Sequence, residues 1–299
     1  MRIGVDLGGT KMEIIALADD GRELYRERIV SPRGSYEATL QAVGEMVGRC
    51  EESTGQTGTV GIGTPGAISP SSGLLKNANS IWLNGMPLDM DLEAELRRPV
   101  RIANDADCFA LSEATDGAGK GSNSVFGVIL GTGTGSGIVM NGHLLSGPNA
   151  IAGEWGHNPL PWPQWDEQPG APCYCGKRGC IETFLSGPGL SRDHYSLTRQ
   201  RLKASEIAAQ CDGAHHLSEE TLARYEDRLA RALSNVINII DPEVIVLGGG
   251  VSKIRSLYQR VPRIWGKYVF SDEVRTRLVP AKFGDASGVR GAAWLWPAG

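Results

Sequence analysis

The sequence contains no long apolar run, little net charge and few cysteines, and each shortage excludes a class of protein. No stretch approaches the roughly 18 apolar residues that a membrane-spanning helix needs. The N-terminal apolar segment is short and ends in a glycine turn, so it does not resemble a secretory signal. The net charge of −4 and the isoelectric point near 5.8 give no electrostatic case for nucleic-acid binding. We therefore expect a cytoplasmic protein that binds neither membranes nor nucleic acids.

Three of the six cysteines fall together in CYCGKRGC at 173–180. A disulfide, a redox centre or a metal site could explain such a cluster, but cytoplasmic thiols stay reduced, which disfavours the disulfide. Buried small thiols are a further alternative, although this segment is polar and rich in turns. His157 precedes it, Cys3His is a common zinc ligand set, and the glycines allow tight bends. We predict that zinc is bound by His157, Cys173, Cys175 and Cys180.

An internal duplication indicates two related domains. GVDLG at 4–8 and GVILG at 127–131 are short apolar strands that each enter a glycine-rich turn. A second apolar strand follows each turn, at 12–18 and 137–141, and ends in Asp-Gly or Asn-Gly, which favours a hairpin to a third strand. Two such copies predict two similar α/β domains, and the chain is long enough to form both.

The remaining periodicity predicts where the other elements lie. Apolar spacing indicates helices over 35–53, 108–114 and 219–239, with buried strands at 59–63, 100–103 and 244–250. The segment 116–124 has the composition of a linker, and the C-terminal apolar segment is expected to fold back as a helix. Proline and tryptophan at 161–172 indicate a rigid insertion. We expect one domain at 1–117 plus 288–299 and a larger one, with the zinc site, at 118–287.

Glycine turns follow three of the expected strands, at 6–11, 131–137 and 248–252. Such turns let backbone N–H groups approach an anion closely and can cradle phosphate. None matches the P-loop pattern or the dinucleotide-binding pattern, but together they suit a nucleotide held between two domains. Asp6, before the first turn, is a candidate for Mg²⁺; its alternative role is to cap the end of a strand.

A candidate acid–base residue, Asp105, follows the strand at 100–103. Asn104 and Asp105 lie where site residues often gather in open α/β sheets. An ionised Asp105 could take a proton from a sugar hydroxyl while Asn104 hydrogen-bonds the sugar. The alternative is that Asp105 caps the following helix, and both roles can hold together. For Asp107 we expect a capping or surface role.

Motifs along nearly the whole chain resemble the ROK family of sugar kinases. They are GVDLGGTK, GIGTPG, NANSIWLNG, IANDADC, ILGTGTGSG, GEWGH and CYCGKRGCIE. Within that family NANSIWLNG, GEWGHNPLPW and CYCGKRGCIETF look most like bacterial fructokinases, also described as manno(fructo)kinases. The N-acetylglucosamine kinase branch, which shares most of these motifs, is the alternative.

The resemblance implies an actin-like ATPase fold, with two ribonuclease-H-like domains around a central cleft and a small zinc knuckle. It implies a homodimer, ATP with Mg²⁺, and a structural zinc ion. It makes Asp105 the general base. The sugar contacts that it implies are Gly66, Asn79, Asn104, Asp105, Glu154, His157 and Glu182. The nucleotide and Mg²⁺ candidates, from the turns and the resemblance together, are Asp6, Gly8, Gly9, Thr10, Lys11, Thr132, Gly133, Thr134, Gly135, Gly137, Gly249 and Gly250.

We therefore expect an ATP-dependent hexose kinase that converts D-fructose to fructose 6-phosphate. An N-acetyl-D-glucosamine kinase, or a broad glucose and mannose kinase, is the alternative. A sugar-sensing regulator of this family would carry a DNA-binding segment before its first strand, whereas here a strand is expected from Arg2. An actin-like structural protein or chaperone ATPase would not explain a zinc knuckle beside glutamate and histidine.

Overall fold

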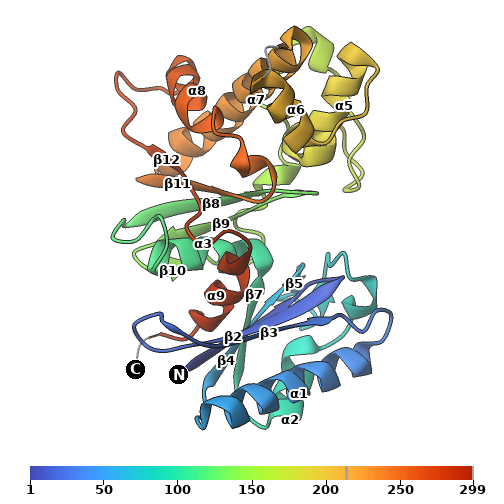
Figure 1. Ribbon diagram of the computed structural model, residues 1–299, viewed down its shortest axis with the longest axis vertical. Coiled ribbons are helices and arrows are strands. Elements are labelled where there is room, and N and C mark those ends of the chain that lie inside the picture. Colours follow the sequence, from blue (N-terminus) through green and yellow to red (C-terminus); the bar gives the residue numbers. More distant parts are fainter. Residues whose placement is uncertain (213–214, 298–299) are drawn as a thin grey trace. The chain divides into compact units, whose positions relative to one another are not determined.

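Two five-stranded mixed sheets form the framework of the computed structural model, which describes residues 1–212 and 215–297 (Figure 1). The first sheet has the order β3-β2-β1-β4-β7 and the second the order β10-β9-β8-β11-β12. Each is an antiparallel meander of three strands joined to two parallel strands, which confirms the predicted duplication. The strands of the first sheet are β1 (Arg2–Leu7), β2 (Lys11–Leu17), β3 (Glu23–Val30), β4 (Thr59–Thr64) and β7 (Val100–Asn104). Those of the second are β8 (Ser124–Leu130), β9 (Thr134–Met140), β10 (His143–Leu144), β11 (Val244–Gly248) and β12 (Arg277–Pro280).

Helices cover both faces of the first sheet, because side chains alternate along its strands. On β2, Met12 and Ile14 pack with the helix α1 (Tyr36–Thr54) in the main core. Ile15 and Leu17 face the other way, against α9 (Ser287–Ala293). Figure 1 shows α1 and α9 on opposite faces of this sheet. The sheet is therefore the middle layer of a three-layer unit.

Glycines in the strands allow α9 to approach the sheet closely. A Cβ on Gly4 of β1 would overlap the carbonyl oxygen of Val289, and one on Gly61 of β4 would overlap that of Ala292. These glycines of GVDLG and TVGIG are therefore required for helix–sheet packing.

The helices are local consequences of the sequence. Helix α1 begins after Ser35, whose hydroxyl accepts a hydrogen bond from the N–H of Ala38 at 3.1 Å, and ends at Gly55 in the left-handed conformation. The other helices are α2 (Leu88–Leu96), α3 (Asp105–Thr115), α4 (Ile181–Leu185), α5 (Gly187–Thr198), α6 (Ala204–Asp212), α7 (His216–Ile240) and α8 (Leu257–Ile264). A two-stranded sheet pairs β5 (Ala67–Ile68) with β6 (Leu75–Lys76). No helix in the described part of the chain has the length and apolar character to cross a membrane.

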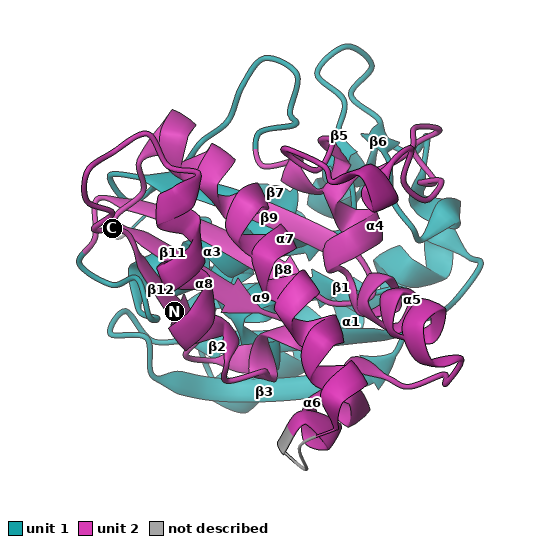
Figure 2. Ribbon diagram, turned by 90° about the horizontal axis from the view of Figure 1, so that it is seen from above, with its two compact units in different colours: residues 1–121, 137–152, 285–299 teal, residues 122–136, 153–284 magenta. Residues whose placement is uncertain are grey.

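The chain divides into two compact units, coloured separately in Figure 2. Unit 1 comprises residues 1–121, 137–152 and 285–299, and unit 2 comprises 122–136 and 153–284. The domain boundaries expected from the sequence, 1–117 with 288–299 and 118–287, stay a prediction, and their last residues, 298–299, lie outside the described part of the chain.

The expected strands and helices are present with small shifts at their ends, except around the second glycine turn. The sequence suggested a turn through 131–137, but β9 already begins at Thr134. The reason is packing: a Cβ on Gly137 would lie 2.8 Å from the Ala106 carbonyl oxygen and from the Asp107 Cα. Gly137 is therefore a strand residue at a close approach to α3, and the turn is confined to 131–133.

Candidate functional site

The carboxyl ends of β1, β4 and β7 lie along one edge of the first sheet, because these strands are parallel and in register. Asp6 is near the end of β1, Thr64 ends β4 and Asn104 ends β7. Gly66 follows β4 with φ of +80°, and a Cβ there would overlap the carbonyl oxygen of Lys76. This edge of unit 1 therefore brings together the sugar and acid–base candidates of the first half of the chain.

Asn104 is fixed by two hydrogen bonds of its side chain. Its Oδ1 accepts from the N–H of Ala106 at 2.9 Å, which makes Asn104 the N-cap of α3, and its Nδ2 donates to the Gly66 carbonyl at 3.0 Å. The exposed Asp105 also accepts from the N–H of Ala106, at 2.8 Å to Oδ1. The N-cap expected at Asp105 is thus at Asn104, and Asp105 is the first residue of the helix.

Asp6 lies in a carboxylate-rich environment. Burial and the neighbouring charges of Asp105 and Glu13 together raise the pKa of Asp6 to about 7. Glu13 itself is ion-paired with Arg26 and Arg28, whereas a cation between Asp6 and Asp105 would relieve their repulsion. Carboxylate oxygens are the protein ligands that Mg²⁺ prefers, so Asp6 fits the expected ion, which leaves Asp105 as the candidate base.

The first glycine turn, Gly8 to Lys11, is held by the segment that follows β3. The Ser31 hydroxyl donates to the Gly8 carbonyl at 2.5 Å. The Arg33 guanidinium donates from Nε to the Gly9 carbonyl at 3.0 Å and from Nη2 to the Thr10 hydroxyl at 2.9 Å. Ser31 and Arg33 could not be predicted from the sequence, because nothing local links them to a turn more than twenty residues earlier. Their hydrogen bonds occupy the carbonyl oxygens of Gly8 and Gly9 and the hydroxyl oxygen of Thr10.

In unit 2, two further glycine turns follow the parallel strands β8 and β11. The N–H of Thr134 donates to Oε2 of Glu182 at 2.9 Å, and the N–H of Gly187 donates to the carbonyl of Gly131 at 2.8 Å. Gly249 has φ of +83°, and a Cβ there would lie 2.5 Å from the Leu130 carbonyl oxygen. The two turns therefore share one edge of the second sheet, with Glu182 beside the first of them.

The four predicted zinc ligands lie together in unit 2. Their ligand atoms are all within 4.8 Å of one another. Cys175 Sγ is 3.6 Å from Cys180 Sγ, and Cys173 Sγ is 3.5 Å from His157 Nδ1. Tetrahedral zinc with Zn–S bonds of about 2.3 Å requires ligand atoms about 3.5–3.8 Å apart, so the set fits zinc. All six cysteines are described, and each is a thiol and not half of a disulfide.

The other ring nitrogen of His157 contacts a tyrosine. Nε2 of His157 lies 2.8 Å from the Tyr174 hydroxyl, and the two rings pack edge to face. His157 is also an expected sugar contact, and a sugar that binds at this nitrogen would have to displace the phenol. Glu154, another expected sugar contact, is exposed just before the short 3-10 helix Trp155–His157.

The candidates thus form a group in each unit. Unit 1 holds Asp6, Gly8, Gly9, Thr10, Lys11, Gly66, Asn79, Asn104, Asp105 and Gly137. Unit 2 holds Thr132, Gly133, Thr134, Gly135, Glu154, His157, Cys173, Cys175, Cys180, Glu182, Gly249 and Gly250. In unit 1, a Cβ on Gly9 would lie 4.0 Å from Asn79 Oδ1, which places that sugar candidate beside the phosphate candidate. The roles of these residues stay predictions.

Comparison with known proteins gives a consistent family. The ROK family matches residues 2–298. The chain is 40% identical over 299 residues to an N-acetyl-D-glucosamine kinase of Photobacterium profundum, covering 99% of each chain. It is also 40% identical over 300 residues to an N-acetyl-D-glucosamine kinase of Escherichia coli, again covering 99% of each. A solved ROK hexokinase of Thermus thermophilus matches with a TM-score of 0.87 and 29% identity, over 98% of this chain and 96% of that one.

A Streptomyces griseus ROK glucokinase solved with glucose and AMPPNP matches with a TM-score of 0.79 and 26% identity, over 100% of this chain and 99% of that one. The expected resemblance to fructokinases is not supported, because these curated relatives are named N-acetyl-D-glucosamine kinases. The motifs that suggested fructokinase therefore did not identify the relatives that the whole chain matches. The family predicted from the motifs is confirmed: the chain belongs to the ROK family of sugar kinases.

Proposed function

We propose that the protein is an ATP-dependent N-acetyl-D-glucosamine kinase that phosphorylates the primary hydroxyl of the sugar. The observation that carries this proposal is the 40% identity to kinases of that name across 99% of both chains. The expected fructokinase activity has no comparable support. The expected homodimer and cytoplasmic location stay predictions.

The reaction type agrees with the edge of the first sheet. Phosphoryl transfer requires little covalent work from a protein, so positioning and charge stabilisation dominate. Asp105 is exposed at the first position of α3, where its carboxylate can accept a proton from a sugar hydroxyl. Asn104 is held by Gly66 and Ala106, so it fixes the strand end from which Asp105 projects.

The nucleotide candidates are the glycine turns. Because Ser31 and Arg33 engage oxygens of Gly8, Gly9 and Thr10, the first turn is stiffened from outside. Its N–H groups are then available to phosphate oxygens without the cost of ordering the loop. Mg²⁺, when bound near Asp6 and Asp105, would neutralise charge on the phosphates of ATP.

Zinc would have a structural role in this proposal. All four positions of a tetrahedral site are filled by His157 and the three cysteines, and closed sites of this kind are structural. The ion would join the 3-10 helix Trp155–His157 to the loop that precedes Glu182. It would thereby hold Glu154 and Glu182, the expected sugar contacts, without taking part in the chemistry.

The tryptophans near the expected sugar contacts give no steric reason against a substrate with an N-acetyl group. Trp155 is buried, packs on Phe126 and donates from Nε1 to the Ala232 carbonyl at 3.3 Å. Trp82 packs against the core of unit 1, and Trp162 stacks on Tyr268. Each large ring therefore has a packing partner of its own, and no steric argument for a smaller sugar rests on them.

A coupled ADP-release assay across N-acetylglucosamine, N-acetylmannosamine, glucose, mannose and fructose tests the proposal. A site built for the N-acetyl group leaves buried polar groups unpaired when a sugar lacks it, at about 1–3 kcal/mol per group, which is about 5- to 150-fold in kcat/KM. We expect the highest kcat/KM for N-acetylglucosamine. A higher value for fructose would overturn the substrate and restore the fructokinase assignment, while ADP release without any sugar would overturn kinase activity.

A further inference from the structure

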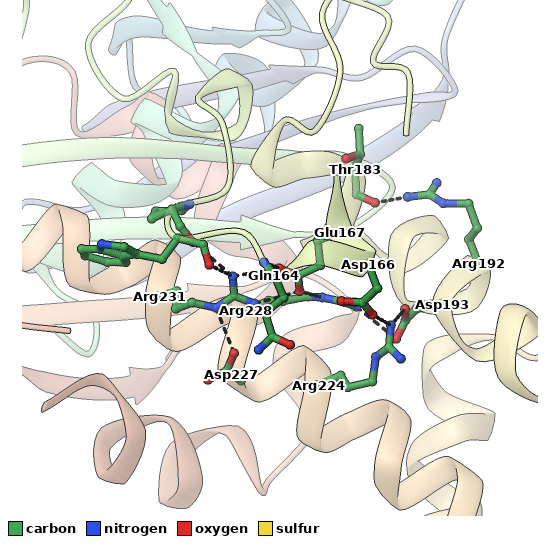
Figure 3. Close-up of polar contacts among 12 residues, drawn as sticks. Gln164, Asp166, Glu167, Thr183, Arg192, Asp193, Arg224, Asp227, Arg228 and Arg231 are labelled. Carbon is green, nitrogen blue, oxygen red and sulfur yellow. Dashed lines mark hydrogen bonds and ion pairs between the residues drawn. The ribbon is translucent and has the colours of Figure 1, made fainter. Parts of the chain in front are cut away.

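Glu167 is a buried carboxylate at the centre of the 161–172 insertion (Figure 3). Its Oε1 accepts from Arg228 Nε at 2.7 Å and from Arg231 Nη2 at 2.8 Å. Its Oε2 accepts from Arg231 Nη1 at 2.9 Å and from the backbone N–H of Gln164 at 2.8 Å. Both arginines belong to α7, so the carboxylate fastens the middle of the insertion to that helix.

Further contacts to α7 strengthen this attachment. Arg231 Nη1 also donates to the carbonyls of Pro161 at 3.1 Å and Trp162 at 2.8 Å. On the exposed side, Arg224 pairs with Asp166 at 3.3 Å. Arginines of one helix therefore hold the insertion at its start and at its middle, and Figure 3 shows the contacts of Asp166 and Glu167 at the middle.

The two ends of the insertion pair with the segment that carries the last zinc ligand. The N–H of Leu160 donates to the Gly179 carbonyl at 3.0 Å, and that of Ile181 donates to the Asn158 carbonyl at 2.8 Å. From the other end, the N–H of Gly179 donates to the Ala171 carbonyl at 3.0 Å. The insertion is thus a strap whose ends hold residues 177–181 and whose middle is tied to α7.

The charge of Glu167 is retained despite burial. Burial alone disfavours the ionised form, but hydrogen bonds from Arg231 and Arg228 outweigh it and lower the pKa of Glu167 to about 2. A buried ion pair is weak evidence for stability, because an apolar replacement of similar volume is often equally stable. Fixed geometry is the property that such a cluster provides and an apolar contact does not.

We propose that Glu167 is a positioning residue that fixes the strap and, through it, holds His157 and the cysteine loop in place for zinc and sugar. This inference rests on the proposed zinc site and sugar kinase activity. His157 lies just before the strap and Cys173 just after it, so movement of residues 161–172 relative to α7 would change the separation of two metal ligands. Glu167 itself contacts neither metal nor substrate.

The test uses zinc-loaded full-length protein and the variant Glu167→Gln, which keeps the shape and removes the charge. We expect zinc to transfer to a chromogenic chelator about 10-fold faster, the size of effect seen when residues that orient metal ligands are changed. The KM for the sugar should rise about 10-fold with kcat changed less than about 3-fold, since the reacting groups remain in place.

Glu226→Gln is the matched control. Glu226 is equally buried on α7, but it accepts from Ser256 at 2.6 Å and pairs with Arg260 at 3.3 Å, away from the strap. It should lower thermal stability and leave zinc release and KM at the wild-type values. If Glu167→Gln lowers thermal stability like the control but releases zinc at the wild-type rate, the positioning role is overturned.

Asp166→Asn covers the case in which Glu167→Gln does not fold. It removes one partly exposed pair at the same turn, and the expected increase in zinc release is about 2- to 5-fold, equivalent to one such ion pair. Amide hydrogen exchange should become faster within 161–172 of this variant, and unchanged release and exchange would overturn the proposal. Wild-type protein that binds no zinc would overturn the metal site, whatever the behaviour of Glu167.

Discussion

At the scale of single residues, Asn104 and Asp105 have separate roles. The sequence left open whether Asp105 is both the cap of the helix and the general base, and in the structure Asn104 is the cap. A pattern of strand, Asn-Asp and helix can place either residue at the N-cap, since both side chains accept hydrogen bonds from the first helical N–H groups. Here Asn104 is the N-cap and also bonds Gly66, which leaves Asp105 exposed with its carboxylate beside the Asp6 region. The arrangement supports Asp105 as the proposed base. Because Asn104 caps the helix, Asp105 can be substituted without removing that cap.

Asp105→Asn should lower kcat about 10²- to 10⁴-fold, because a general base contributes a factor of that size. The KM for the sugar should stay near the wild-type value, because the amide retains the volume of the carboxylate and the cap at Asn104 is intact. Steady-state kinetics on the purified variant would measure both. Asp107→Asn is the comparison, two residues along the same helix, and should change kcat much less; the opposite order would move the base to Asp107.

At the scale of elements, close packing of helices on glycine-bearing partners determines how unit 1 is built. A Cβ on Gly291 of α9 would overlap the carbonyl of Cys108 on α3, and Gly4 and Gly61 admit the same helix against the sheet. Helix α9 therefore fits between α3 and the sheet only because glycine supplies the space at each contact.

Gly291→Ala should destabilise the protein by about 1–3 kcal/mol, as overpacking of a close-packed interior does. Gly48→Ala is the control: Gly48 is exposed in α1, and an added Cβ there meets no atom within 4 Å. That change should be neutral or stabilising by up to about 1 kcal/mol, because alanine is the better helix former. Thermal unfolding of both variants measures the difference. Equal stability of the two variants would contradict the packing argument.

The elements that sequence patterns predicted well are those determined locally. Helix α1 has its apolar spacing, its Ser35 cap and its terminal Gly55 in one stretch of sequence. The clustering of the four proposed zinc ligands was also predictable, since three of them lie within one short glycine-rich loop. The partners of Glu167 were not, because Arg228 and Arg231 are more than sixty residues away and arginines on a long helix usually face solvent. Arg228 and Arg231 are buried by contact with a segment distant in the sequence, which local patterns do not indicate.

The choice of sugar is another property that local patterns did not determine. GEWGH and CYCGKRGCIE surround expected sugar contacts such as His157 and Glu182, but they suggested a fructokinase, which the names of the relatives do not support. An N-acetyl group would be distinguished by side chains that line its pocket, and those need not belong to any motif. Identity across the whole chain includes such positions, so it favoured N-acetylglucosamine where the motifs had favoured fructose.

At the scale of the whole molecule, the proposed zinc site would couple folding to sugar binding. Its ligands come from the 3-10 helix at 155–157 and from the loop at 173–180, and the strap joins the two. A metal that binds only the folded arrangement of its ligands adds its binding free energy to the stability of the fold. The segments that it would join also carry Glu154 and Glu182, so we expect the same event to order these candidate sugar contacts.

Removal of zinc should therefore lower thermal stability and weaken sugar binding together. Metal analysis of the purified protein should find about one zinc per chain, and Cys175→Ser should abolish it, because the remaining three ligands hold zinc much less tightly. Cys211→Ser, a change of a thiol on α6 outside the ligand set, should retain the metal, the melting temperature and the sugar affinity. Calorimetric titration with the sugar, with and without chelator, measures the coupling. Zinc-free protein with full stability and undiminished sugar affinity would show that the cysteine cluster does not organise the site, and the strap would then have to hold Glu154 and Glu182 without a metal.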